Sequence, residues 1–382
     1  MKTRSEVFCL MGCCLGAAVV TASVNAAQFE ELTEYFRQAN VVAGPELVEC
    51  TLSGGSRTSC FRITVTPSPA TYTPGPWCPD TIADSAENGG IWLENGEVHD
   101  VSGAFIEDMA NFYSDNDWQL FDEDTGAVFV TDTLEKCAGA AQPEVDPEFR
   151  QQCVECQMAY LDEDATVTYT IPLEPVAVEQ PLDTRDVGSG LAFNGIRLDA
   201  PAPVADILGN YTLAPFDDCG GHVNLHVGYH YHAATDCLDD TASKTEHGSV
   251  VGVAMDGYLI HARLLNDGSL PADLDQCGGH ETDELSYHYH AGEQGSNAIL
   301  SCLKAEYGCV SEEPGVECDA SVSRRPGGGG DGRPDFAAAA QRLGVSEDEL
   351  MRALGAPPPD FDQAAGTLGV TVDALQEAMG RP

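Results

Sequence analysis

The stretch CGGHVNLHVGYHYH at residues 219–232 returns as CGGHETDELSYHYH at residues 277–290. Both copies share Cys-Gly-Gly-His, six variable residues and Tyr-His-Tyr-His. The segments before them are also alike, since NGIRLDA at residues 194–200 resembles DGYLIHA at residues 256–262. We therefore predict a tandem duplication of one β-rich unit. Each unit has a glycine-led strand, a loop, a glycine turn and a Tyr-His-Tyr-His strand, and the two units should pack about a pseudo-two-fold axis.

Strand geometry predicts that the histidines of each copy gather on one face. Residues two apart in a β-strand point the same way, so His230 and His232 should lie side by side, with the tyrosines opposite. The glycine turn allows a sharp reversal that returns His222 to them. Three imidazoles with one open position suit zinc or copper. The predicted ligands of such a divalent transition metal are His222, His230, His232, His280, His288 and His290.

We expect these six imidazoles to converge where the two units meet, either in a shared site or in a two-metal site. Two separate mononuclear sites are the alternative. The other explanation of the motif is structural, because tyrosine–histidine packing or a buried polar network would also favour a fixed repeat.

Other polar residues of the motif are less clearly assigned. His226 and Glu284 hold equivalent places, and both residue types can ligate metal or accept a hydrogen bond from a ligand. His261 aligns with Asp199, again two types that can bind metal. His247 has no counterpart in the repeat, and its polar surroundings predict exposure to solvent.

An aspartate stands two residues before each Cys-Gly-Gly-His, at Asp217 and Asp275. One interpretation is that these carboxylates fix imidazole tautomers through the far ring nitrogen. The other is that they cap the turn.

The two motif copies and the strand DGYLIH at residues 256–261 resemble the YHYH-domain family of secreted bacterial proteins. The resemblance covers residues 182–302. It implies an exported bacterial protein, and it implies no reaction, because the family has no established activity. In the family this strand more often ends in tyrosine, so His261 departs from the pattern.

The first residues predict export. Lys2 and Arg4 precede an apolar run over residues 7–20, and Val24-Asn25-Ala26 resembles a signal-peptidase site. We therefore expect residues 1–26 to be a signal peptide and the mature protein to be secreted or periplasmic. The apolar run is too short to span a bilayer, and we expect no membrane insertion.

The cysteines agree with this compartment. Three of the fifteen lie in the leader, and the remaining even number predicts a disulfide framework. Proximity in sequence predicts the pairs Cys50–Cys60, Cys219–Cys237, Cys277–Cys302 and Cys309–Cys318. Cys153 and Cys156 form a C-x-x-C motif without a thioredoxin-like context, so we interpret both as structural.

The charge excludes some partners. The formal net charge is −44, and it becomes −45 without Lys2, Arg4 and Glu6 of the leader. Such a surface repels nucleic acid and anionic lipid and attracts cations. Adaptation of the whole proteome to salt would produce the same composition.

We predict a mainly β, disulfide-rich fold followed by a small helical tail. Residues 27–181 form a β-rich first part, with strands at residues 59–65, 127–131 and 166–171 and helices near residues 28–40 and 105–113. Residues 182–323 form the duplicated YHYH domain, and residues 324–334 form a Gly/Pro linker.

Residues 335–382 contain a second repeat of helical apolar spacing, with a capping box at Ser346 and Glu349. We expect four short helices there. They form either a module for a protein or cell-surface partner or a passive appendage.

The leading functional prediction is a secreted metal-binding protein that sequesters, delivers or is stabilised by its metal. One alternative is a metal-dependent enzyme, a hydrolase with Glu284 or Asp275 as general base or a copper oxidoreductase. Another is a cell-surface polymer-binding module with exposed tyrosines as stacking platforms. The chain contains no G-x-S-x-G, H-E-x-x-H or phosphate-loop motif, and the sequence assigns no catalytic residue.

The exported protein should begin near Ala27 and contain no free thiol. Mass spectrometry of secreted protein, alkylated with and without reduction, measures both properties. Two or more alkylated cysteines in unreduced protein would reject the complete disulfide framework.

Overall fold

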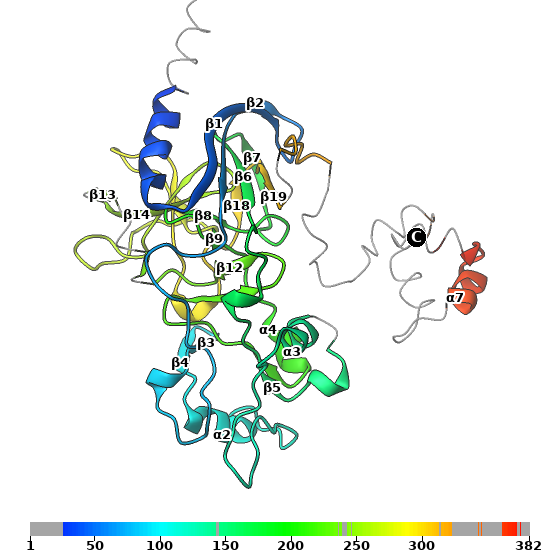
Figure 1. Ribbon diagram of the computed structural model, residues 1–382. Coiled ribbons are helices and arrows are strands. Elements are labelled where there is room, and N and C mark those ends of the chain that lie inside the picture. The colour runs from blue at the N-terminus through cyan, green and yellow to red at the C-terminus, as the bar shows by residue number, and fades with distance from the viewer. Residues whose placement is uncertain are drawn as a thin grey trace, which may run out of the picture. The chain divides into compact units, whose positions relative to one another are not determined.

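The structure is a computed structural model, and it describes residues 26–142, 145–235, 237–238, 243–245, 247–312, 315–322, 343, 345, 361–372 and 375 (Figure 1). The chain divides into two compact units, Met1–Gly327 and Gly328–Pro382. Residues 1–25 of the predicted leader lie outside the described residues.

The first unit is mainly β, as predicted, and is built on a nine-stranded sheet. The strand order is β11-β12-β9-β8-β14-β15-β17-β16, with β13 added beside β14. The strands are β8 (Gly190–Ala192), β9 (Arg197–Leu198), β11 (Gly221–Asn224), β12 (Gly228–Tyr231), β13 (Ser243–Thr245), β14 (Gly248–Ala254), β15 (Leu259–His261), β16 (Gly279–His280) and β17 (His288–His290).

The two halves of this sheet have the same pairing pattern. β8 pairs antiparallel with β9, β9 parallel with β12, and β12 antiparallel with β11. On the other side β14, β15, β17 and β16 follow each other with the same senses. The halves meet where β8 and β14 pair antiparallel. Each Tyr-His-Tyr-His segment therefore lies near an outer end of the strand order.

Glycines make the central pairing possible. A Cβ on Gly190 would lie 2.2 Å from the carbonyl oxygen of Val253, and one on Gly252 would lie 2.7 Å from that of Leu191. Both distances are shorter than van der Waals contact, so the two backbones approach this closely only without side chains at these positions.

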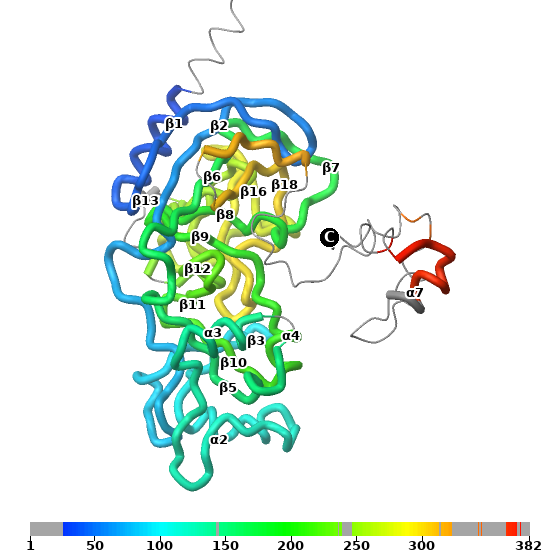
Figure 2. Tube along the Cα trace, turned by 45° about the vertical axis from the view of Figure 1, so that its right-hand side comes forward, coloured from blue at the N-terminus to red at the C-terminus, as the bar shows by residue number. Residues whose placement is uncertain are grey.

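Smaller sheets surround this one. A four-stranded sheet has the order β1-β2-β6-β19, and three two-stranded pairs are β3–β4, β5–β10 and β7–β18. Their bounds are β1 (Val41–Thr51), β2 (Arg57–Val65), β3 (Ile91–Glu94), β4 (Glu97–Asp100), β5 (Gln152–Cys153), β6 (Val167–Pro172), β7 (Ala177–Leu182), β10 (Thr212–Leu213), β18 (Leu303–Ala305) and β19 (Cys309–Ser311). Figures 1 and 2 show the β1–β2 hairpin and helix α2 at opposite ends of this unit.

The strands predicted at residues 59–65 and 166–171 are present as β2 and β6. The strand predicted at residues 127–131 is wrong. This segment makes only isolated bridges, to Thr81, Phe121 and Cys153, because each neighbour meets it at one residue and no ladder extends.

Helices are few and short, as expected. Residues 26–35 are helical and continue into a 3-10 turn, which agrees with the helix predicted near residues 28–40. Helix α2 begins earlier than predicted, because the Ser102 hydroxyl accepts from the Phe105 amide and caps it. The helices are α2 (Gly103–Phe112), α3 (Leu134–Ala140), α4 (Val204–Gly209) and α7 (Phe361–Leu368), with 3-10 turns η1 (Phe36–Gln38), η2 (Ala86–Asn88), η3 (Pro147–Phe149), η4 (Met158–Tyr160) and η6 (Gln294–Ser296).

In the second unit, α7 lies within the predicted helical tail. The capping box at Ser346 and Glu349 lies outside the described residues, as does the predicted linker. Among the described helices, none has the length and apolar character needed to cross a bilayer.

Six disulfides join the twelve cysteines of the described residues, and the four predicted pairs are confirmed. The cysteines of the C-x-x-C motif do not pair with each other. Cys153 bonds to Cys78 and Cys156 bonds to Cys137, so both are structural, as interpreted.

Replacing Gly190 or Gly252 by alanine should lower the free energy of unfolding by about 1–3 kcal/mol, because the new methyl group forces β8 and β14 apart. Gly209→Ala is the control, since this exposed glycine has open space around it. Urea unfolding measures the difference. Equal stability of all three variants would show that the close approach of β8 and β14 is not required.

Candidate metal centres

The first histidine group lies on the hairpin of β11 and β12. His222 stands directly opposite His230 in the antiparallel ladder, and His232 follows two residues later on the same face. The ring centroids are 4.8 Å apart for His222 and His230, 5.0 Å for His222 and His232, and 4.8 Å for His230 and His232. One nitrogen from each ring lies within 4.8 Å of the other two. The spacing of the motif therefore brings together the three residues that it predicts.

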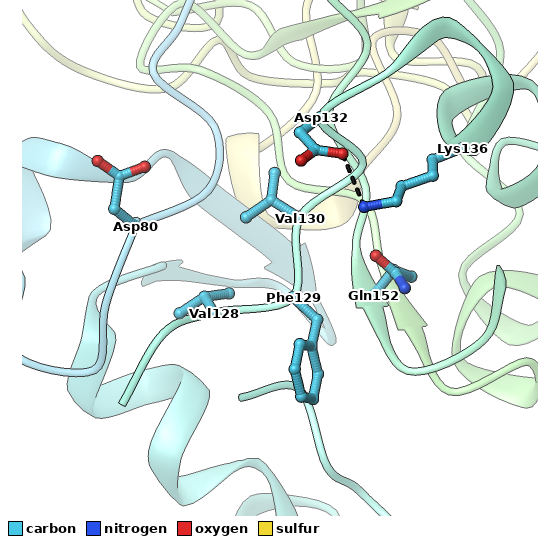
Figure 3. A pocket seen from close by; sticks show the side chains of 7 residues that line it. All are labelled: Asp80, Val128, Phe129, Val130, Asp132, Lys136 and Gln152. Atoms are coloured by element: carbon cyan, nitrogen blue, oxygen red, sulfur yellow. Dashed lines mark hydrogen bonds and ion pairs between the residues drawn. The ribbon is translucent and has the colours of Figure 1, made fainter. Parts of the chain in front are cut away.

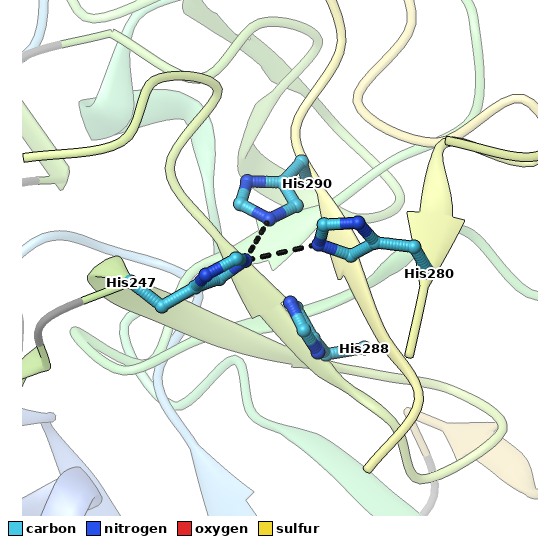
Figure 4. A group of neighbouring side chains, drawn as sticks. All are labelled: His247, His280, His288 and His290. Carbon is cyan, nitrogen blue, oxygen red and sulfur yellow. Dashed lines mark hydrogen bonds between the residues drawn. The ribbon is translucent and has the colours of Figure 1, made fainter. Parts of the chain in front are cut away.

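The second group has four members. His280 stands opposite His288 on β16 and β17, His290 ends β17, and His247 joins them from the turn between β13 and β14. The Nε2 atom of His247 lies 2.9 Å from Nε2 of His280 and 3.1 Å from Nε2 of His290. Figure 4 shows the four rings turned toward one another. The predicted exposure of His247 is wrong, because the β13–β14 hairpin places this turn residue against β16 and β17, where it is half-buried.

The two glycines of each motif have separate tasks. Gly220 and Gly278 adopt φ angles of 80° and 81°, which glycine reaches without strain. A Cβ on Gly221 would lie 2.5 Å from the Tyr229 hydroxyl, and the equivalent contact in the second copy, between Gly279 and Tyr287, would be 2.2 Å. The first glycine makes the turn and the second leaves room for a tyrosine.

Backbone carbonyl groups fix the tautomer of five imidazoles. In each of them Nδ1 lies at hydrogen-bond distance from a carbonyl oxygen: 2.9 Å for His230 and Gly228, 2.7 Å for His232 and Ala200, 2.9 Å for His280 and Ala272, 2.8 Å for His288 and Ser286, and 2.7 Å for His290 and Ala262. A carbonyl oxygen only accepts, so Nδ1 carries the hydrogen. In a neutral ring Nε2 is then left with its lone pair, which is the form that binds a metal.

The lone pairs of the second group are not all satisfied within the protein. Nε2 of His288 is buried and has no hydrogen-bond partner among the described residues, and the side chain is only 3% exposed. Nε2 of His280 and of His290 both face Nε2 of His247, which can donate at most one hydrogen. Buried polar atoms are normally hydrogen-bonded. A cation among the four rings would satisfy all of these nitrogens at once.

Burial keeps three of these rings neutral. It lowers the pKa of His232 to about 3 and the pKa of His290 to about 4. It also holds the pKa of His222 well below its usual range, and the neighbouring His230 and His232 lower it further. At neutral pH these three rings therefore present lone pairs rather than positive charge.

Comparison with known protein families gives one match, which covers residues 168–272 and is described as YHYH protein. This part of the chain is a YHYH-family domain. The matched residues contain the first histidine group together with His247 and His261, and they end before the second Cys-Gly-Gly-His. Comparisons with curated proteins and with solved structures give no significant match.

Around the YHYH domain, the motif aspartates cap turns. Asp217 accepts from the backbone amides of Gly75, Cys219 and Gly221 and from the hydroxyl of Tyr229. Asp275 repeats this pattern with Cys277, Gly279 and Tyr287. Among the described residues, neither carboxylate forms a hydrogen bond with an imidazole. The turn-capping interpretation is confirmed, and the carbonyl groups take the place of the tautomer-fixing carboxylates.

The tyrosines of the motif form a buried layer on the opposite face. The Tyr231 hydroxyl accepts from the Asn194 amide and lies 2.7 Å from the Tyr72 hydroxyl. The Tyr289 hydroxyl donates to Asp256 at 2.7 Å. Tyr229, Tyr231 and Tyr289 are 0% exposed, so these rings cannot act as stacking platforms for a polymer.

The remaining motif residues differ between the two groups. His261 is buried, with its ring 4.5 Å from that of His288, and its Nδ1 has no partner among the described residues. Asp199, at the equivalent place, pairs with Arg197 at 2.9 Å and lies 3.9 Å from Nε2 of His230. His226 and Glu284 are exposed and belong to neither group of the described residues, so their expected part in the sites is not found.

The two groups are separate. Four strands, β9, β8, β14 and β15, lie between β12 and β17 in the sheet order. Among the described rings, no contact joins a histidine of one group to a histidine of the other. The expected convergence of six imidazoles is therefore replaced by two groups, one in each half of the sheet.

A cavity of about 310 Å³ lies elsewhere, between Asp80, Val128–Val130 and Gln152 (Figure 3). Lys136 at its rim pairs with Asp132 at 2.7 Å. Its lining contains no member of either histidine group, so it supplies no substrate pocket beside the imidazoles.

Asp217→Ala should lower the free energy of unfolding by about 3 kcal/mol, because three amides and a buried tyrosine hydroxyl lose their acceptor. Asp275→Ala is the matched comparison, and it should cost about 1 kcal/mol, since that carboxylate is 32% exposed and water can replace it. Chemical denaturation measures both values. A larger loss for Asp275→Ala would contradict the assignment of Asp217 as the buried cap.

Proposed function

We propose that this protein binds one divalent transition-metal ion in each histidine group and acts as a metal-binding protein outside the cytoplasm. The supporting observations are the close approach of the ligand atoms and the fixed tautomers in both groups, together with an unsatisfied Nε2 atom in the second. A packing device would need the ring nitrogens to bond to each other or to the protein, and the Nε2 atom of His288 bonds to neither.

The donor atoms favour zinc or copper. Imidazole nitrogen suits both metals, whereas calcium and magnesium prefer oxygen ligands. Four ligands around zinc at 2.0–2.1 Å are about 3.4 Å apart in a tetrahedron. Nε2 of His247 lies 2.9 and 3.1 Å from Nε2 of His280 and His290, which is close to this value. In each group the ligand nitrogens lie within 4.8 Å of one another, so only small ring movements would bring all of them to such distances.

The same proposal includes export of the protein and the division of its chain into a signal peptide, a core and a helical tail. Six disulfides are compatible with an oxidising compartment, and the strongly negative charge would favour the approach of cations. We place the signal peptide at residues 1–26, the core at residues 27–323 and the helical tail, with its protein or cell-surface partner, at residues 335–382.

The hydrolase alternative is less well supported. Asp275 is committed to a turn by three hydrogen bonds, and Glu284 is exposed and outside the second group. Neither residue is therefore assigned as a general base.

Elemental analysis of protein from its native compartment should find two equivalents of zinc or copper per chain. The double change His230→Ala and His232→Ala should remove one equivalent, and His288→Ala with His290→Ala should remove the other. Metal loading at 100 times the Kd should raise stability by about 2.7 kcal/mol for each site.

His226→Ala is the matched control, because this exposed histidine lies inside the first motif and should leave both equivalents in place. Retention of both metals by the two double variants would reject the proposal.

A further inference from the structure

The two histidine groups are built on equivalent hairpins but differ by one ligand. His247 lies fourteen residues before His261, and the same step back from Asp199 reaches Arg185. Arg185 is exposed and paired with Asp183, and a guanidinium cannot ligate a metal. Among the described residues, the first group therefore has none that corresponds to His247.

Asp199 stands beside the first group without completing it. Its Oδ1 atom accepts from Arg197 at 2.9 Å and from the Ala200 amide at 2.8 Å. Its Oδ2 atom lies 3.9 Å from Nε2 of His230. Asp199 is nevertheless too far from at least one of the other two histidines to belong to the group, in which all ligand atoms lie within 4.8 Å of one another. Oδ2 therefore lies beside the group, where it can accept a hydrogen bond.

We propose that His222, His230 and His232 hold their metal with one open coordination position, which takes water or a small anion beside Asp199, whereas His247 closes the second group. This inference rests on the proposed metal binding. Four imidazoles complete a tetrahedral zinc site, and three leave a position for an exogenous ligand, which is the difference between a structural and a reactive centre.

The surroundings select a small ligand. His230 and His232 are only 4% and 5% exposed, which favours a ligand of few atoms. Arg197 pairs with Asp199 at 2.9 Å and offsets the negative charge of this carboxylate, so an anion is not repelled from the position.

Cobalt(II) and azide test the difference between the groups. Two full-length single-site proteins are needed: His288→Ala with His290→Ala leaves the first group, and His230→Ala with His232→Ala leaves the second. Each is loaded with one equivalent of cobalt(II), and azide is added while the visible spectrum is recorded. Azide should shift the bands of the first group and leave those of the second group unchanged.

His247→Ala in the protein that retains only the second group is the reciprocal variant. It should make that group respond to azide, because it removes the closing ligand. A response from both unaltered groups, or from neither, would overturn the inference while cobalt binding upheld the proposed function. Failure of both proteins to bind cobalt would reject the proposed function itself.

Asp199→Asn tests the remaining explanation, in which Asp199 is itself the fourth ligand of the first group. If the first group is silent to azide and this change makes it respond, Asp199 is a fourth ligand and there is no open position. If the group already responds, the change should alter the azide concentration at half-saturation and leave cobalt bound.

Discussion

The hydrogen bond from imidazole Nδ1 to a backbone carbonyl oxygen is the interaction on which both sites depend. It decides which nitrogen keeps a lone pair, and it orients the ring. For His232 and His290 the acceptors are Ala200 and Ala262, which lie just after the ends of β9 and β15. Those strands pair parallel with β12 and β17. The register of the sheet therefore sets the chemistry of the rings, without any carboxylate in that role.

A buried layer of tyrosine hydroxyl groups holds the same strands from the other side. A buried hydroxyl needs a partner, and each half of the sheet supplies two: Asp217 and Asn194 in one, and Asp275 and Asp256 in the other. One strand thus presents imidazole nitrogens on one face and a satisfied polar network on the other. Alternation along a strand makes both possible within four residues.

The equivalent halves are not chemically identical. His261 of one half faces the ring of His288, while Asp199 of the other is bound to Arg197. His247 comes from a hairpin that has no counterpart among the described strands of the first half. Two halves with the same pairing pattern therefore carry unequal sets of candidate ligands. The difference comes from side chains at equivalent places and from the added β13–β14 hairpin that supplies His247.

Much of the site could be predicted from the sequence. The alternation of Tyr-His-Tyr-His placed His230 and His232 on one face, and the glycine pair required the turn that returns His222, because both effects are local. The nearest cysteine pairs followed for the same reason. The sequence could not place His247, since the β13–β14 hairpin that carries it is distant in sequence from β17 and no periodic signal marks it. Nor could it separate the two groups. Only the antiparallel contact of β8 with β14, made by backbones at Gly190 and Gly252, puts the Tyr-His-Tyr-His strands toward opposite ends of one sheet.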